Sequence, residues 1–125
     1  MTYQLNEAQT KWLEALESGA YAQTGNRLKD SNGFCCLGVA CEVLGVAATK
    51  SENVEEPWMY EGESLLCPLS IVEKLRLRSN NGDIADPPAG DPNGRTLAEM
   101  NDVGASFSEI AAFVRANPER VFRPC

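Results

Sequence analysis

Five cysteines are the most reactive side chains of this 125-residue chain, and the chain has no histidine to activate them. Catalysis of the Ser-His-Asp or Cys-His type needs an imidazole as its base, so this chain alone cannot perform it. Zinc sites with histidine ligands are excluded for the same reason. Cys35 and Cys36 stand where a helix is expected to begin, which lowers a thiol pKa, but their apolar neighbours raise it. We therefore expect these thiols to pack in the core rather than to act as nucleophiles.

A zinc site made of cysteines alone is the alternative interpretation of the same residues. Such a site needs Cys67 or Cys125 to join Cys35, Cys36 and Cys41, and the sequence has no C-x-x-C pair. The spacings of a calcium loop and of the two glycine-rich phosphate-binding motifs are also missing. We expect neither a metal nor a cofactor. The odd number of cysteines, without an export signal, predicts reduced thiols.

The charge of the chain argues against a nucleic-acid partner. It has 18 acidic and 11 basic residues, a net charge of −7 and a pI near 4.6, and a negative surface repels phosphate backbones. Capping boxes at Thr96 and Ser106 begin two short helices, which could form a DNA-binding helix-turn-helix. The second of these helices offers only Arg115 among apolar and acidic residues. We favour a helical pair that packs on the core.

A different set of residues suits a small ligand. Aromatic rings beside arginine, lysine and amide groups are typical of sites that stack a base and hold its ribose and phosphate. The candidates are Tyr21, Gln23, Arg27, Lys29, Trp58 and Tyr60. The alternative is that Trp58 and Tyr60 form edges of the core and that Arg27 is a solvated strand residue. Asn101 and Asp102, followed by Gly104, either form a functional polar pair or cap a helix with an Asx turn.

The periodicity of the apolar residues predicts an α+β fold and a single domain over residues 1–125. A capped helix is expected after Asn6, with Trp12 as its core anchor. The segment Cys36–Leu44 is apolar nearly all round, which indicates a central buried helix. Gly38 in such a helix indicates close packing against another element. No apolar stretch approaches the ~20 residues of a membrane span.

Short antiparallel strands are expected beside the central helix. The segment 21–29 is predicted to be extended and to meet a turn at 30–33, and a hairpin is predicted between 58–60 and 64–66. Pro68 opens a further helix. The turn at 80–83 is of a kind that closes hairpins, and residues 86–94 are expected to form an irregular loop.

Three motifs make the chain resemble a large group of small proteins encoded by bacteriophages and prophages. They are W-L-x-x-L-x-S-G-x-Y-x-Q from Trp12, G-F-C-C-L-G-V from Gly33 and L-x-x-x-N-D-x-G-x-S-F-x-x-I-A from Leu97. Together they cover a little under half of the chain. The middle of the chain, residues 46–94, is the part that varies in the group.

This resemblance implies a phage-derived protein of the host cytoplasm. Small phage proteins without enzymatic motifs often bind and counteract host defence, so we expect a non-enzymatic binding protein that sequesters a nucleotide-derived signal. A homo-oligomer is expected because two subunits enclose a ligand more fully than one. The predicted ligand contacts are Tyr21, Gln23, Arg27, Trp58, Tyr60, Asn101 and Asp102. The alternatives are a protein inhibitor of a host defence protein and a metal- or carboxylate-dependent nucleotide hydrolase; neither nucleic acid nor a membrane is an expected partner.

Overall fold

The secondary structure agrees with the predicted α+β class. The computed structural model describes residues 4–25, 27–30, 32–50, 58–63, 66–85 and 96–123, which form six helices and two two-stranded antiparallel sheets. The helices are α1 (Glu7–Ser18), α2 (Cys36–Val43), α3 (Leu69–Leu75), α4 (Leu97–Asp102), α5 (Phe107–Ala116) and α6 (Pro118–Val121). The strands are β1 (Lys29–Asp30), β2 (Gly33–Phe34), β3 (Ala48–Lys50) and β4 (Trp58–Tyr60).

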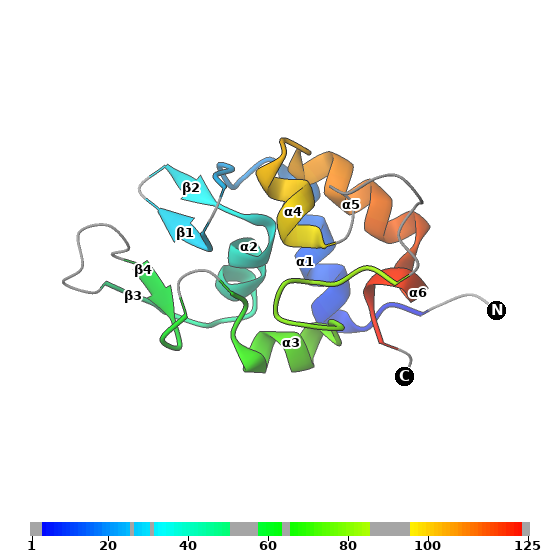
Figure 1. The fold of residues 1–125 in the computed structure, drawn as a ribbon, viewed down its shortest axis with the longest axis horizontal. Helices are drawn as coiled ribbons and strands as arrows, with labels where there is room; N and C mark the ends of the chain where they lie inside the picture. The colour runs from blue at the N-terminus through cyan, green and yellow to red at the C-terminus, as the bar shows by residue number, and fades with distance from the viewer. Residues whose placement is uncertain are drawn as a thin grey trace.

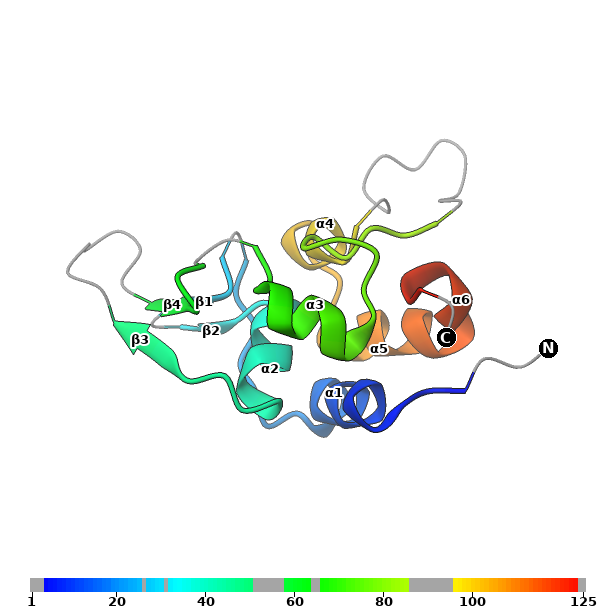
Figure 2. The same ribbon diagram turned by 90° about the horizontal axis from the view of Figure 1, so that it is seen from below.

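The apolar helix α2 is central, as predicted. It lies between the two small sheets on one side and the remaining helices on the other (Figure 1). Helix α1 packs against α2, α3 and α5, and the view from below shows α1 along one edge of the helical part (Figure 2). Trp12 of α1 is 0% exposed, and its ring nitrogen donates a hydrogen bond of 2.8 Å to the carbonyl of Cys36. Burial of this indole with its N–H satisfied anchors α1 to the start of α2.

The helix starts follow from their capping residues. Asn6 and Ser106 each form a complete capping box, with Gln9 and Glu109 respectively. The Thr96 hydroxyl accepts a hydrogen bond of 2.9 Å from the backbone N–H of Glu99. These contacts satisfy backbone donors that have no partner inside the helix. The three predicted helix starts are therefore confirmed.

The strand pairing contains a partner that the sequence does not predict. Strand β4 pairs with β3 upstream, with Lys50 opposite Trp58. Within the predicted hairpin, the described residues show a bridge between Tyr60 and Glu63, while Ser64 and Leu65 lie outside the described residues. The turn at 80–83 leads into a bridge between Asp83 and Thr96 instead of closing a hairpin between two strands. Strands this short carry no alternating pattern that could select a partner.

The last helix, α6, is an element that the sequence does not predict. The sequence predicts that a helix ends before Asn117-Pro118, and it predicts no helix after it. Proline is also favoured at the first position of a helix, and Pro118 begins α6. The predicted loop 86–94 lies outside the described residues.

Gly38 is where α2 touches the backbone of the segment before β1. A Cβ built on Gly38 would overlap the carbonyl oxygen of Leu28, which also accepts a hydrogen bond of 3.1 Å from the Cys35 N–H. The prediction of close packing at this glycine is confirmed. Because the obstacle is backbone rather than a flexible side chain, α2 and Leu28 must separate to admit any side chain here.

We expect Gly38→Ala to destabilise the protein by about 2–3 kcal/mol, the usual range for overpacking. Alanine favours a helix over glycine by ~1 kcal/mol, so the steric term must exceed this gain. Urea unfolding measures the difference. Gly45→Ala is the control: nothing lies within 4 Å of its Cβ, so its cost is limited to the strain of its φ of +88°, ~1–2 kcal/mol. A Gly38→Ala protein as stable as the original would show that the contact is not tight.

Candidate functional site

Aromatic rings and lysines gather where the two sheets meet. The ammonium of Lys29 lies 4.3 Å from the centroid of the Trp58 ring and 5.1 Å from that of Phe34. The ammonium of Lys50 lies 5.7 Å from the Trp58 centroid. The rings of Tyr21 and Phe34 meet edge to face, with centroids 5.6 Å apart. We call these five residues, Tyr21, Lys29, Phe34, Lys50 and Trp58, the aromatic–lysine cluster.

Strand register brings the members of the cluster together. Lys29 is the cross-strand partner of Phe34, and Lys50 is the cross-strand partner of Trp58. Side chains of directly opposed residues lie close enough to interact. Strands β1 and β4 are in contact, as both ribbon views show (Figures 1 and 2), so that the two pairs join through Lys29 and Trp58.

Tyr21 is positioned in the cluster by backbone hydrogen bonds between the residues that follow it and Phe34. The Phe34 N–H donates to the carbonyl of Ala22 at 2.9 Å, and the Thr24 N–H donates to the carbonyl of Phe34 at 2.7 Å. The segment after α1 therefore runs beside β2. This is the extended segment that the sequence predicts.

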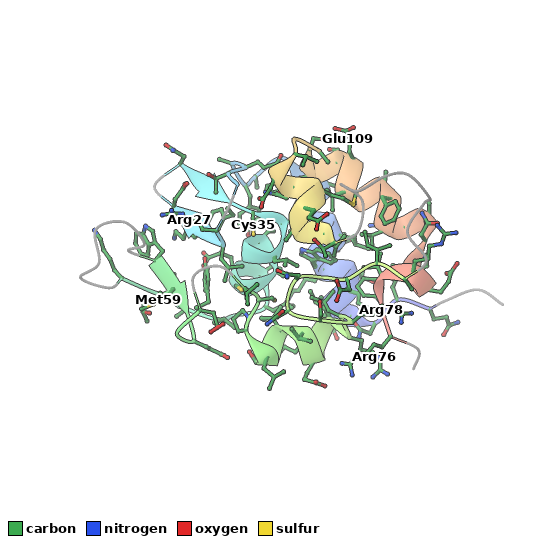
Figure 3. All side chains as sticks on the ribbon, in the orientation of Figure 1. Arg27, Cys35, Met59, Arg76, Arg78 and Glu109 are labelled. Carbon is green, nitrogen blue, oxygen red and sulfur yellow. The ribbon has the colours of Figure 1, made fainter. Side chains whose placement is uncertain are left out.

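Charged residues of both signs accompany the cluster. Figure 3 shows Arg27 beside the first sheet, on the same side of the molecule as Met59 of β4. The neighbouring Asp30 is engaged in its own turn: burial works to raise its pKa, but hydrogen bonds from Thr24, Asn32 and Gly33 and the charge of Arg27 lower it overall. Lys29 and Lys50 thus place two positive charges at the half-exposed rings, while the segment that joins Lys50 to Trp58 carries Glu52, Glu55 and Glu56.

Tyr60, by contrast, lies in the core. Its ring is 0% exposed, and its hydroxyl donates a hydrogen bond of 2.9 Å to the carboxylate of Glu42 on α2. Burial and this carboxylate raise the pKa of the Tyr60 phenol. The structure therefore places Trp58 and Tyr60 of one strand in different environments, with only the Trp58 ring reaching the surface.

Asn101 is a buried link between three segments. It is 4% exposed, and its amide oxygen accepts hydrogen bonds from Gln23 Nε2 at 2.9 Å and from the Cys36 N–H at 3.1 Å. Its amide nitrogen donates to the carbonyl of Thr24 at 2.7 Å. Gln23 also donates to the carbonyl of Ala105 at 2.7 Å. The amide groups of Gln23 and Asn101 thus connect segments of the fold, while the adjacent Asp102 is exposed.

The cysteines before and in α2 are packed as the sequence predicts. Cys35 caps the helix by accepting a hydrogen bond of 3.4 Å from the Gly38 N–H, and both Cys35 and Cys36 are buried. Burial raises the pKa of the Cys35 thiol to about 12 and that of Cys36 well above its usual value. Desolvation outweighs the helix dipole here, so neither thiol is poised as a nucleophile.

Phe34 and Lys50 are the cluster members that sequence reasoning did not identify. Phe34 stood in a cysteine-rich apolar stretch and Lys50 before the acidic segment, so neither was marked as a ligand contact. The signal that locates them is cross-strand pairing, which the sequence does not display in strands of two or three residues.

The described residues contain neither a membrane-spanning helix nor a group of metal ligands. No helix in the described ranges is long and apolar enough to cross a membrane. Among the same residues, no three His, Cys, Asp or Glu side chains are grouped so as to hold a metal ion.

The comparisons with known proteins identify a family. The chain is a small α+β domain with a central apolar helix, and the model of the family described as "Domain of unknown function (DUF8296)" matches residues 5–118. The chain therefore belongs to the DUF8296 family. No curated protein and no solved structure matches it.

We expect Asn101→Ala to lower the free energy of unfolding by about 3 kcal/mol. The substitution leaves the Cys36 N–H and the Thr24 carbonyl without their side-chain partner, and each unsatisfied buried group costs ~1–3 kcal/mol. Urea unfolding measures the loss. Asn80→Ala is the matched asparagine control, because substitution at an exposed position typically changes stability by ~0.5 kcal/mol or less. Equal effects of the two substitutions would contradict a structural role for Asn101.

Thiol labelling tests the environment of the cysteines. In a Cys125→Ser background, we expect a maleimide at pH 8 to modify Cys35 and Cys36 at least ~100-fold more slowly than a free thiol, because only the thiolate reacts. Unfolding in urea should make them react at the normal rate. Rapid labelling of Cys35 in the native protein, located by peptide mapping, would restore the nucleophile hypothesis.

Proposed function

We propose that this protein is a non-enzymatic binding protein that holds a small nucleotide-like anion at the aromatic–lysine cluster. The observation that carries the proposal is the Trp58 ring with the ammonium groups of Lys29 and Lys50 at 4.3 and 5.7 Å from its centroid. A half-exposed indole offers a stacking surface to a base, which is worth ~1–3 kcal/mol. The two ammonium groups over the ring supply positive charge for a phosphate.

Binding at this surface exchanges contacts that already exist. A base that stacks on Trp58 takes the place of a lysine ammonium at the ring, and the displaced ammonium can then pair with the phosphate of the same ligand. A cation–π contact at an exposed site is worth ~0.5–1 kcal/mol, whereas a charge-assisted hydrogen bond is worth ~1.5–3 kcal/mol. The exchange therefore favours a ligand that combines an aromatic ring with an anion over a simple anion.

Two observations weigh against thiol catalysis and against DNA binding. The thiols of Cys35 and Cys36, the most reactive groups near the cluster, have raised pKa values. The DNA-binding hypothesis depends on Arg115 of α5, and both its Nε and its Nη2 donate to the Glu17 carboxylate, at 2.7 and 2.8 Å. A phosphate would have to displace this bidentate ion pair.

The biological role in this proposal is to counteract the antiviral defence of the host. The resemblance to phage and prophage proteins supports sequestration of a nucleotide-derived signal, which requires tight binding without turnover. The aromatic–lysine cluster lies on the outside of one chain, so enclosure of a ligand calls for a second subunit over the same surface. A homo-oligomer is therefore part of the proposal.

Native mass spectrometry of protein purified from cells, followed by release and identification of bound small molecules, tests the proposal. An oligomer that carries an intact nucleotide supports sequestration. Recovery of a hydrolysed product would indicate an enzyme instead. A ligand-free monomer that also ignores a panel of cyclic mono- and dinucleotides would contradict the proposal and favour a protein inhibitor, which a pull-down from host lysate then tests.

We expect Trp58→Ala and Lys29→Ala each to weaken binding of a cyclic nucleotide from the panel by at least ~10-fold, from loss of the stacking surface and of a charge. Trp58→Phe should retain most of the affinity because it keeps a ring. Lys11→Ala on the exposed face of α1 is the matched lysine control. Because Trp12 is buried, ligand-induced quenching of the tryptophan fluorescence reports on Trp58. Unchanged affinity of Trp58→Ala would place the ligand elsewhere.

A further inference from the structure

A cavity of about 630 Å³ lies beside α3, among residues other than those of the aromatic–lysine cluster. Its size is within the range of ~300–1,000 Å³ that is typical of small-molecule sites. One wall is α3 with Val72, and the facing wall is the returning segment 77–80 with Leu77. The two walls are joined by backbone hydrogen bonds of 2.9 Å, from Cys67 to Asn80 and from Leu77 to Val72. These bonds hold the cavity open without a ligand.

Carboxylates line the cavity near the start of α3. Glu61 and Glu63 come from the turn after β4. Both oxygens of Glu61 lie 2.9 Å from the Ser70 hydroxyl, which fixes this carboxylate against the first turn of the helix. The Glu63 backbone is held by reciprocal hydrogen bonds with Tyr60 of 2.8 and 2.9 Å. This region attracts a cation and repels a phosphate.

Guanidinium groups line the cavity near the end of α3. Arg78 donates through Nε and Nη2 to the carbonyls of Arg120, Glu119 and Phe122, at 3.1, 2.7 and 3.3 Å. Arg123 is placed by its backbone N–H, which donates to the Arg76 carbonyl at 2.7 Å, and its side chain meets Glu73 at 3.4 Å. Figure 3 shows Arg76 and Arg78 on the side of the molecule away from Arg27 and Met59. Glu73 lines this end as well, so a ligand carboxylate would replace Glu73 at Arg123 and share Arg78 with the three carbonyls.

The remainder of the lining is largely apolar. Pro68, Leu69, Val72 and Leu77 contribute aliphatic surface, and the buried thiol of Cys67, 2% exposed, adds to it. A ligand with a positive charge at one end, a negative charge at the other and an apolar middle matches this lining. A simple anion meets the carboxylates of Glu61 and Glu63, and a simple cation meets the arginines, so neither matches the whole lining.

We propose that this cavity binds a zwitterion of dipeptide size, with its ammonium at Glu61 and Glu63 and its carboxylate at Arg78 and Arg123. The contacts of Glu61 with Ser70 and of Arg123 with Glu73 lie three residues apart on α3, a rise of about 4.5 Å. The side chains extend this span. Two extended residues span about 7 Å, so a dipeptide is long enough to reach both ends, with an aliphatic side chain against Val72 and Leu77.

Titration with the dipeptide Ala-Leu, followed by amide chemical shifts in NMR spectra, tests this site. Shifts should concentrate at Val72, Leu77 and Asn80. N-acetyl-Ala-Leu lacks the ammonium and Ala-Leu-amide lacks the carboxylate, so each should bind at least ~10-fold more weakly through loss of a charge-assisted contact. Equal binding of the capped and free dipeptides, or no shift at about 10 mM Ala-Leu, would overturn the proposal.

Variants separate this site from the aromatic–lysine cluster. Glu63→Gln keeps the size of the side chain and removes its charge, and it should weaken Ala-Leu binding at least ~10-fold. Glu14→Gln on the exposed face of α1 is the matched control and should have no effect. Trp58→Phe should also leave Ala-Leu binding unchanged. Binding that responds to Trp58→Phe but not to Glu63→Gln would contradict this site, whatever the outcome of the nucleotide experiments.

Discussion

The buried amide of Asn101 is the interaction on which the arrangement of this domain depends. A single side chain on α4 binds the backbone of Thr24, the first N–H of α2 and the amide of Gln23. These groups belong to segments that are far apart in the sequence. Inside a protein each of them costs free energy unless it is paired. One amide thus fixes the position of α4 against both α2 and the segment before β1.

The hydrogen bonds of Asn101 also position part of the aromatic–lysine cluster. Thr24 receives the Asn101 hydrogen bond through its carbonyl and donates its N–H to Phe34. Phe34 in turn lies opposite Lys29 in the first sheet and beside the ring of Tyr21. The half of the surface that contains Tyr21 and Phe34 is therefore held by backbone contacts, and the half that contains Lys50 and Trp58 meets it through Lys29. A substitution in the cluster can change its chemistry without loss of its scaffold.

The features that were predictable from the sequence are those with local causes. Capping at Asn6, Thr96 and Ser106, the apolar α2 and the packing of Gly38 each depend on residues within one segment or on a steric requirement of the backbone. Tyr21, Lys29 and Trp58 of the aromatic–lysine cluster were also marked by their residue types, and their contact with a ligand stays a prediction.

The features that were not predictable have causes elsewhere in the chain. The pairing of β3 with β4 brings Lys50 to Trp58, and nothing in three residues specifies that partner. The cavity beside α3 joins a turn after β4, a helix, a returning loop and the residue Arg123. Residues so far apart carry no spacing rule, so no motif could reveal it.

Tyr60 explains why a strand of three residues can present Trp58 at a defined position. Its ring is buried, and its hydroxyl is bonded to Glu42 of α2, so β4 is attached to the central helix through one side chain. Trp58 is two residues earlier and therefore projects from the same face of the strand. The core anchor and the surface ring are thus set by one strand. Glu42 belongs to α2, the helix that Asn101 also holds through the Cys36 N–H. Both sheets are therefore attached to α2. This common attachment brings Lys29 of one sheet to Trp58 of the other.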